Sequence, residues 1–382
     1  MALMPDTSPA FIIDEQALQD SIAVLGYLRQ QSDCRVLYSI KALPLTTILK
    51  SLQPFVDGFS VSSLFEAKLA HSILSPEQSI HLATPGVRED EVGEIKKICS
   101  HISCNSLSQR KAFLTSDLSL GLRINPKQSL VNDARFDPCR LHSKLGIDIN
   151  KVDADMLQGI EGLHCHNVFS QQDYRALITT MTQLESQLGG YFKQLKWLNL
   201  GGGYLFKQID NHQPFIELVQ SLRKKYQLEV YIEPGKAVVN DAVSLVATVI
   251  DCFDSDGKMV AVLDTSINHN PEVFEYQRQP DILQNDLQGS YLAVLVGSSC
   301  LAGDVFGEYQ FKQAIQVGDK ITFINLGAYT LVKANRFNGY NLPDIYSLKS
   351  GELCCIKQYS YQQYQNQWES DKNESNRNDS GR

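Results

Sequence analysis

Lys41 is the residue of this 382-residue chain around which a chemical function can be built. It follows the run Leu37-Tyr38-Ser39-Ile40, whose apolar pattern predicts a buried strand with an amine at its carboxyl end. Burial disfavours an ammonium ion and lowers its pKa, and a neutral amine can attack a carbonyl group to form a Schiff base. The alternative is a lysine whose stem is buried and whose ammonium group reaches solvent.

Three consecutive glycines, Gly201, Gly202 and Gly203, follow another strand-like run at Trp197 to Leu200. The unobstructed N–H groups of such a run could hold a phosphate group. The run follows the seventh of eight strand-like segments, and barrels often bind phosphate at that position. A plain tight turn is the alternative.

Glu233 ends the eighth strand-like segment, in the sequence Ile232-Glu233-Pro234-Gly235. An amine, an anion site and a carboxylate together meet the needs of pyridoxal 5'-phosphate, which uses an imine to its aldehyde, a phosphate cradle and an acid for its ring nitrogen. Glu233 could instead form a structural ion pair.

His164 and His166 alternate along a strand, so both imidazoles are expected on the same side. Some hydrolase barrels begin a zinc site in this way. No second histidine pair falls at another strand end, and the chain has only eight histidines. We therefore expect no metal, and we expect His166 to stack on the cofactor ring.

The elements that must position these residues alternate between strands and helices. Eight strand-like segments are predicted: Val36 to Ser39, Gly58 to Ser62, Ile80 to Ala83, Ile102 to Asn105, Leu120 to Asn125, Gly162 to His166, Trp197 to Leu200, and Val230 to Glu233. This pattern predicts an α/β fold, a (β/α)8 TIM-like barrel. The carboxyl ends of barrel strands converge at one mouth, which would gather Lys41, His166 and Glu233.

Short strands separated by turn signals such as Asp256-Gly257 follow from about Ala237. They are predicted at Val243 to Val249, Met259 to Leu263, Tyr291 to Val296, Lys320 to Ile324 and Cys354 to Lys357. They predict a C-terminal antiparallel β domain that an N-terminal strand could join. The expected division is a barrel at 15–236, a β domain at 1–14 and 237–359, and a disordered tail at 360–382, where aliphatic residues are almost absent.

Composition narrows the functional classes. The net charge of -8, without a basic block, gives no electrostatic footprint for nucleic acid or an anionic membrane. No run reaches the roughly 18 apolar residues of a membrane span. The nine cysteines are irregularly spaced without a CxxC pair, so reduced thiols and a cytoplasmic location are expected.

Seven motifs occur in one order along the chain: Tyr38-Ser-Ile-Lys41, His164-Cys-His166, Gly201-Gly202-Gly203, Glu233-Pro-Gly235, Gly297-Ser-Ser-Cys300, Gly327-Ala-Tyr329-Thr330 and Phe337-Asn-Gly339. In these motifs the chain resembles the alanine racemase-fold pyridoxal phosphate decarboxylases, a group that includes ornithine and diaminopimelate decarboxylases. Further segments, Leu263 to Ser266, His269 to Glu272 and Cys300 to Asp304, most resemble carboxynorspermidine decarboxylases.

The resemblance implies a role for each matched residue. Lys41 would hold pyridoxal 5'-phosphate and exchange it for the substrate amine, and Glu233 would keep the pyridine nitrogen protonated. The remaining cofactor-binding residues would be His166, Gly201, Gly202, Gly203 and Tyr329. Ser170 is not counted among them, because Asn167 to Ser170 replace the family's Gly-Ser pair.

The resemblance also implies that Cys300 reprotonates the α-carbon and that it comes from the second subunit of a homodimer with shared active sites. A buried, unreactive cysteine is the alternative. Leu301 follows Cys300 where ornithine decarboxylases carry Asp and diaminopimelate decarboxylases carry Glu, which favours a longer polyamine substrate. The residues expected to meet it are Lys236, His269, Glu272 and Asp304, although each acid alone could be a solvated surface charge. Lys236, a cation, would contact the substrate carboxylate or else the cofactor phosphate.

The resemblance thus implies decarboxylation of carboxynorspermidine or carboxyspermidine to the triamine in polyamine biosynthesis. Ornithine, lysine or diaminopimelate could be the substrate of the same site. A non-catalytic paralogue that binds a partner is a further alternative, against which the presence of both Lys41 and Cys300 argues.

Overall fold

The computed structural model describes residues 5–370. These residues divide between two compact units. We call Gln16–Asp241 with Gly327–Val332 the barrel unit, and the residues on either side of these segments the sheet unit. Within residues 5–370, no helix combines the length and the apolar character needed to cross a membrane.

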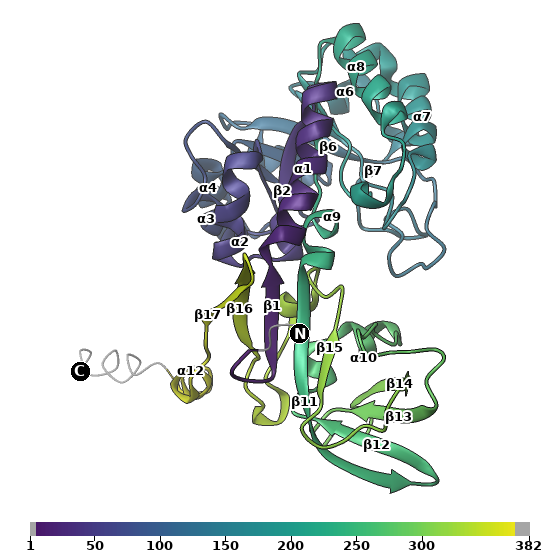
Figure 1. The fold of residues 1–382 in the computed structure, drawn as a ribbon. Helices are drawn as coiled ribbons and strands as arrows, with labels where there is room; N and C mark the ends of the chain where they lie inside the picture. Colours follow the sequence, from purple (N-terminus) through teal and green to yellow (C-terminus); the bar gives the residue numbers. More distant parts are fainter. Residues whose placement is uncertain (1–4, 371–382) are drawn as a thin grey trace, which may run out of the picture. The chain divides into compact units, whose positions relative to one another are not determined.

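Eight parallel strands close the barrel unit into a (β/α)8 barrel, because β5 pairs with β6 and β10 pairs with β2. The ring contains, in order, β2 (Arg35–Ser39), β3 (Gly58–Val61), β4 (Ser79–Leu82), β5 (His101–Cys104), β6 (Ser119–Asn125), β8 (Gly162–His164), β9 (Trp197–Asn199) and β10 (Glu229–Ile232). Figure 1 labels β2 and β6 of this ring. The predicted barrel is therefore confirmed. A short strand that was not predicted, β7 (Ile147–Asp148), pairs with the end of β6.

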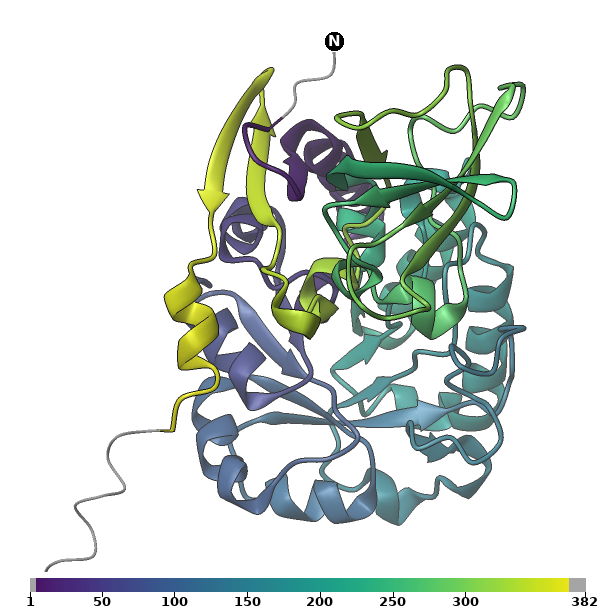
Figure 2. The ribbon, with the colours of Figure 1, turned by 90° about the horizontal axis from the view of Figure 1, so that it is seen from below.

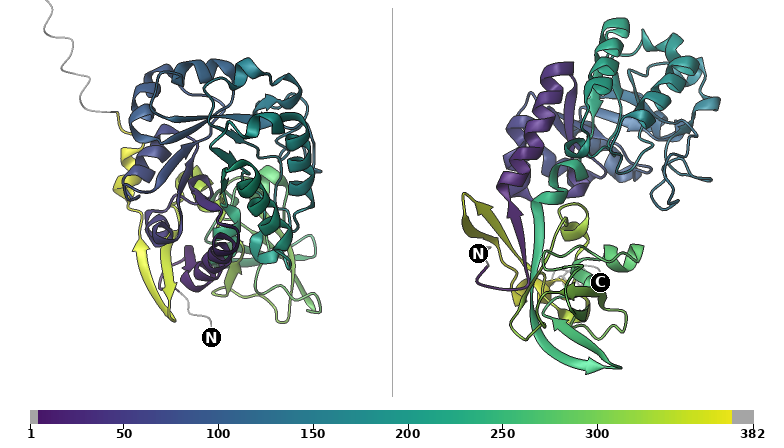
Figure 3. Two further views of the ribbon diagram at one scale, coloured as in Figure 1. Left: turned by 90° about the horizontal axis from the view of Figure 1, so that it is seen from above. Right: turned by 45° about the vertical axis from the view of Figure 1, so that its right-hand side comes forward.

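Helices surround these strands (Figure 3, left). The helices of the barrel unit are α1 (Glu15–Ser32), α2 (Thr46–Leu52), α3 (Leu64–His71), α4 (Glu89–Ile98), α5 (Leu107–Phe113), α6 (Ala154–Leu157), α7 (Arg175–Phe192), α8 (Gln213–Tyr226), α9 (Lys236–Val239) and most of α11 (Thr330–Lys333). Local sequence sets several of their ends: the hydroxyl groups of Ser63 and Ser106 accept N–H groups from the first turns of α3 and α5. α7 buries Leu177, Leu184 and Leu188 at helical spacing.

Trp197 fills part of the barrel interior, where it packs with Leu37 and Tyr231. Two glycines make room for the indole. A Cβ on Gly162 would lie 2.0 Å from Trp197, and one on Gly121 would lie 2.2 Å from it. Small residues on β6 and β8 thus accommodate the large residue on β9.

The sheet unit contains β1 (Ala10–Asp14), β11 (Val243–Ser255), β12 (Lys258–Leu263), β13 (Tyr291–Val296), β14 (Val305–Phe311), β15 (Lys320–Phe323), β16 (Asp344–Lys349) and β17 (Glu352–Lys357). Most neighbours are antiparallel, as predicted, and the N-terminal strand β1 joins the sheet through β11. Two pairings, β1 with β16 and β12 with β13, are parallel. Figure 2 shows β16 and β17 as a yellow hairpin.

The sheet unit also carries α10 (Glu272–Tyr276) and α12 (Tyr361–Asn366). α12 falls within the segment 360–382, where a disordered tail is expected, and Ser360 caps it through the N–H of Gln363. The rest of that segment, 371–382, lies outside the described residues.

Candidate active site

Lys41 lies directly after β2, in the single 3-10 turn Ile40–Ala42. The strand before it is buried from Val36 to Ser39, which fixes the starting point of the turn. The N–H of Ser39 donates to the carbonyl group of Pro234, so the ends of β2 and β10 are tied together. Lys41 and Glu233 therefore emerge from adjacent strands.

The Lys41 amine borders a cavity, so part of its surface stays accessible although protein surrounds it. Desolvation lowers the pKa of Lys41 below its ordinary value. Glu233 and Glu66 oppose this shift, whereas Arg123 adds to it. The site thus raises the fraction of lysine that is a neutral amine.

Glu233 follows β10 and is 5% exposed. Its Oε1 accepts a hydrogen bond of 2.8 Å from the side-chain amide of Asn199. Its Oε2 lies 3.5 Å from Nε2 of His164. The carboxylate is therefore oriented from one side by an amide donor, and a carboxylate can accept further hydrogen bonds.

The glycine run packs tightly against the backbone of Glu233. Gly201 has a φ of 69° and Gly203 a φ of 95°, both in the left-handed region that favours glycine. A Cβ on Gly202 would lie 2.3 Å from the backbone oxygen of Glu233. The side-chain oxygen of Asn199 accepts the N–H of Gly201 over 2.8 Å, so Asn199 joins the glycine run to Glu233.

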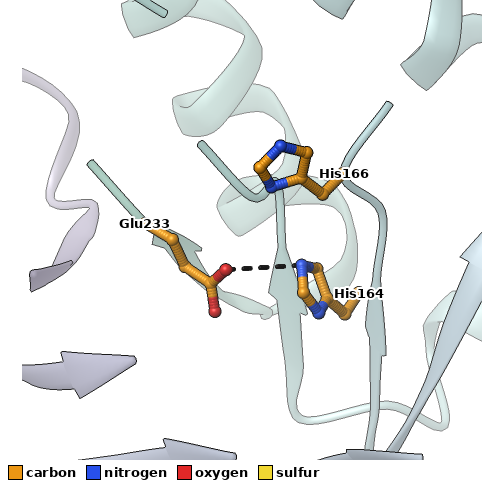
Figure 4. Close-up of side chains that lie close together, drawn as sticks. All are labelled: His164, His166 and Glu233. Atoms are coloured by element: carbon orange, nitrogen blue, oxygen red, sulfur yellow. Dashed lines mark ion pairs between the residues drawn. The ribbon is translucent and has the colours of Figure 1, made fainter. Parts of the chain in front are cut away.

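His164 and His166 face Glu233 from the same side (Figure 4). Nδ1 of His166 accepts the N–H of Gly202 over 3.2 Å. Burial, followed by the charges of Lys41 and Arg123, lowers the pKa of His166 well below its ordinary value, and similar causes act on His164. Both rings are neutral at pH 7.

These three residues also have the geometry of a possible metal site, since one ligand atom from each lies within 4.8 Å of the others. The surrounding charge disfavours a dication there. Arg123 is close enough to lower the pKa of both histidines, and its positive charge would also repel a metal ion.

One cavity of the barrel unit brings together most of the residues predicted for the cofactor. It is lined by Ser39, Lys41, His166, Phe169, Ser170, Gly203, Tyr204, Leu205, Glu233, Gly235, Lys236, Ala237 and Tyr329. The convergence of parallel strand ends explains why residues so distant in sequence share a wall.

Sequence reasoning did not assign Ser170 to this site. The hydroxyl group of Ser170 is buried and has no hydrogen-bond partner among residues 5–370. Phe169 stacks on Phe136 with ring centroids 4.5 Å apart, and the Lys236 ammonium lies 5.5 Å from the Phe169 ring centroid. Ser170 was not predicted because the residue before it is Phe169, whereas the related family has a Gly-Ser pair in this region.

Arg123, Glu66 and Asn199 are further polar residues of the site. The sequence places Arg123 near the carboxyl end of a predicted strand, Leu120 to Asn125, and so among the polar residues of the barrel mouth, whereas Glu66 and Asn199 were not assigned to the site. Arg123 is charged yet sits in the barrel strand β6, which was the sequence signal available for it. Glu66 lies on α3 and accepts the N–H of Ser62 over 2.6 Å. Asn199 precedes the glycine run by two residues, and no sequence motif marks it. Its hydrogen bonds to Glu233 and Gly201 place it in the site.

Cys300 belongs to the sheet unit, in the loop between β13 and β14, and is exposed. Of the residues predicted to meet the substrate there, Glu272 is half-buried and lies 3.9 Å from the Lys333 ammonium. His269 is 0% exposed and Asp304 is 3% exposed. Burial of His269 and Asp304 argues against the predicted contacts with substrate.

The cavity of the barrel unit fits pyridoxal 5'-phosphate. Ser170 offers an unused buried hydroxyl group beside Gly203, Lys236 and Tyr329, which suits a phosphate group. Glu233 offers a buried carboxylate suited to a protonated ring nitrogen, and Lys41 offers the amine.

Comparison with known proteins agrees with this chemistry. The family model described as "Pyridoxal-dependent decarboxylase, C-terminal sheet domain" matches residues 11–327. The carboxynorspermidine/carboxyspermidine decarboxylase of Campylobacter jejuni is 34% identical over 94% of this chain and 97% of its own. The carboxyaminopropylagmatine decarboxylase of Synechocystis is also 34% identical, over 94% of this chain and 95% of its own.

A solved structure extends the likeness to the fold. The crystal structure of carboxynorspermidine decarboxylase from Campylobacter jejuni, complexed with norspermidine, aligns with a TM-score of 0.85 and 32% identity. The alignment covers 94% of this chain and 100% of that one. The chain therefore belongs to the family of pyridoxal-dependent decarboxylases, is of the carboxynorspermidine decarboxylase type, and uses pyridoxal 5'-phosphate as its cofactor.

Proposed function

We propose that this enzyme removes the carboxyl group of carboxynorspermidine and carboxyspermidine to give norspermidine and spermidine. The observation that carries the chemistry is the cavity shared by Lys41 and Glu233, which places a lysine of lowered pKa beside a buried carboxylate. The names of its relatives support the choice of substrate.

Lys41 is the residue proposed to hold the cofactor and to give way to the substrate amine. A lysine with a lowered pKa is more often neutral at pH 7, and only the neutral amine has a lone pair for a carbonyl carbon. The negative charges of Glu233 and Glu66 raise the pKa of Lys41 and so oppose the lowering by burial, which allows Lys41 to take up a proton as well.

Glu233 is proposed to hold a proton on the pyridine nitrogen. Asn199 donates to Oε1 and turns the carboxylate toward the cavity, where the other oxygen can accept the ring N–H. When bound, the cofactor supplies an electron sink for the charge left as carbon dioxide departs.

The remaining residues of the cavity are proposed to fix the ring and its phosphate. His166 is held by the Gly202 N–H and would stack on the ring face. Gly201, Gly202, Gly203 and Tyr329 would bind the phosphate. Ser170 and Lys236 are further candidates, because they line the same cavity as Gly203 and Tyr329.

Cys300 is proposed to return a proton to the α-carbon. We propose that it does so across the interface of a homodimer, as the family resemblance implies. Glu272 is the predicted substrate residue that keeps an accessible carboxylate, and its charge could pair with an ammonium group of the polyamine. A cytoplasmic location is part of the proposal, supported by nine free cysteines.

A second substrate has equal support from sequence identity. The Synechocystis relative, named for carboxyaminopropylagmatine, matches this chain at the same 34% as the Campylobacter one. Agmatine ends in a guanidinium group where spermidine ends in an ammonium group. The distal carboxylates would therefore pair with a planar guanidinium ion in one substrate and with an ammonium ion in the other.

Carbon dioxide release from a panel of substrates tests the proposal. The panel contains carboxynorspermidine, carboxyspermidine, carboxyaminopropylagmatine, ornithine, lysine and diaminopimelate, each with Lys41→Ala as the blank. We expect turnover of the two carboxylated triamines with the highest kcat/KM. A preference for carboxyaminopropylagmatine would select the second candidate, and turnover of ornithine or diaminopimelate alone would overturn both.

A further inference from the structure

The loop that carries Cys300 is built around a buried carboxylate. The loop joins β13 to β14 and runs from Gly297 to Asp304, the residue just before β14 begins. Asp304 is 3% exposed, and an ionised carboxylate in such a place is costly unless donors surround it.

Donors do surround it. Oδ1 of Asp304 accepts the N–H of Ile267 over 2.8 Å, and Oδ2 accepts the N–H of Ser299 over 3.0 Å. The hydroxyl group of Ser299 also donates to Oδ2. These are bonds to a charged acceptor, roughly twice as strong as neutral ones.

The backbone of Asp304 closes the same loop. Its N–H donates to the carbonyl group of Leu301 over 2.9 Å, and its carbonyl group accepts the N–H of Gly297 over 2.8 Å. A Cβ at position 297 would lie 2.2 Å from Oδ1 of Asp304, so the loop closes over the carboxylate only with glycine there.

Cys300 lies between the two residues that Asp304 holds, Ser299 and Leu301. Its own N–H donates to the side-chain oxygen of Asn338 over 3.0 Å. The backbone is thus fixed on both sides, while the residue itself remains exposed. This arrangement directs a thiol without burying it.

We propose that Asp304 is a positioning residue that sets the direction and mobility of the Cys300 thiol, and that it is not a ligand of the polyamine. The inference rests on the proposed function in one respect, the role of Cys300 as the proton donor. A substrate ammonium group would have to displace buried N–H donors to reach Asp304, which is 3% exposed.

Two variants test the proposal. Asp304→Asn keeps the shape but places an amide against the N–H groups of Ile267 and Ser299, and Ser299→Ala removes one donor and keeps the charge, which guards against a failure to fold. Asp254→Asn is the matched control, because Asp254 is exposed and accepts a turn N–H, that of Gly257, in the hairpin between β11 and β12.

The first measurement is the rate of alkylation of Cys300 by iodoacetamide, followed by peptide mass spectrometry. Cys354 and Cys355 are exposed and serve as internal references. We expect the Cys300 rate to rise about fivefold or more in Asp304→Asn and less in Ser299→Ala, with Cys354 and the control unchanged. An unchanged or lowered Cys300 rate in both variants would overturn the proposal.

The second measurement separates kcat from KM. A displaced proton donor lowers kcat about 10- to 100-fold and leaves KM within about twofold. A large rise in KM with kcat retained would make Asp304 a substrate ligand instead. If the wild-type enzyme released no carbon dioxide, the proposed function would fail, and the alkylation rates would still decide the role of Asp304.

Discussion

The side-chain amide of Asn199 lies 2.8 Å from Oε1 of Glu233, and its oxygen accepts the N–H of Gly201 over the same distance. One buried side chain thereby sets both the carboxylate and the glycine run. Because Asn199 is 0% exposed, both bonds are shielded from bulk solvent.

Replacing Asn199 by aspartate should lower kcat about 10- to 100-fold, since an amide donor becomes a second carboxylate beside Glu233 and a hydrogen bond to a charged group is lost. Steady-state kinetics and the visible spectrum of the bound cofactor as a function of pH measure the effect. Asn150→Asp is the control, because Asn150 also donates to a carboxylate, Asp148, but is exposed. Wild-type kcat and an unshifted spectrum in Asn199→Asp would refute the role.

Gly202→Ala should weaken cofactor binding about tenfold or more, because the new Cβ would lie 2.3 Å from the backbone oxygen of Glu233 and would push the two chain segments apart. Equilibrium dialysis of the cofactor measures the change. Gly190→Ala is the matched control. Gly190 lies on α7, and apart from its chain neighbours and the adjacent backbone of that helix no atom of residues 5–370 comes within 4 Å of the position that an alanine Cβ would take. Alanine there should leave binding intact and stabilise the helix by up to about 1 kcal/mol. Equal affinities for the two variants would contradict this account.

Ser170→Ala should weaken cofactor binding without lowering the stability of the cofactor-free protein. If the buried hydroxyl group meets the cofactor phosphate, its loss weakens cofactor binding about 10- to 100-fold. The cofactor-free protein should keep or slightly gain stability, because a hydroxyl group without a partner is removed from the interior. Calorimetric titration with the cofactor and thermal unfolding without it measure the two effects. A fall in stability with unchanged affinity would assign Ser170 a structural role.

Two stacked imidazoles in the barrel should make the fold sensitive to acid. His81 on β4 and His101 on β5 have ring centroids 3.9 Å apart and planes 8° apart. Burial lowers the pKa of His101 to about 4 and that of His81 well below its ordinary value. In the unfolded chain both bind protons near pH 6.5.

Because the pKa of both histidines is lowered in the folded chain, acid lowers the free energy of unfolding. Above about pH 6.5 the two histidines are mostly neutral in both the folded and the unfolded chain, and they cost no stability. As the pH falls from 6.5 toward 4, the histidines of the unfolded chain bind protons that those of the folded chain do not bind, so the free energy of unfolding falls. His101 alone should cost about 3 kcal/mol across this range, and His81 adds to it. Urea unfolding at several pH values measures the loss. His101→Phe should flatten the slope, His71→Asn at an exposed site should not, and identical slopes in all three proteins would contradict the assignment.

The barrel could be predicted from the sequence because each of its strands is a short apolar run followed by a helix. The same regularity predicted that Lys41, His166 and Glu233 share one end of the barrel, since parallel strands finish at a common mouth. The structure places all three around one cavity.

The sheet unit was harder to predict because its pairings join distant segments. β14 was missed because Gly307 interrupts its pattern, and β16 because its parallel partner β1 lies at the opposite end of the chain. The surroundings of Asp304 were equally hard to predict, because one of its hydrogen-bond donors lies far away in sequence. Nothing in Cys300 to Asp304 indicates that the N–H of Ile267 completes a buried cage around its carboxylate.

Borohydride reduction of the enzyme with pyridoxal 5'-phosphate, followed by mapping of the labelled peptide, tests whether Lys41 holds the cofactor of this decarboxylase. We expect a single cofactor adduct on Lys41, which is lost in Lys41→Ala, and we expect Lys236→Ala to be labelled at Lys41 still. Labelling of Lys236 or another lysine, or none at all, would contradict this expectation.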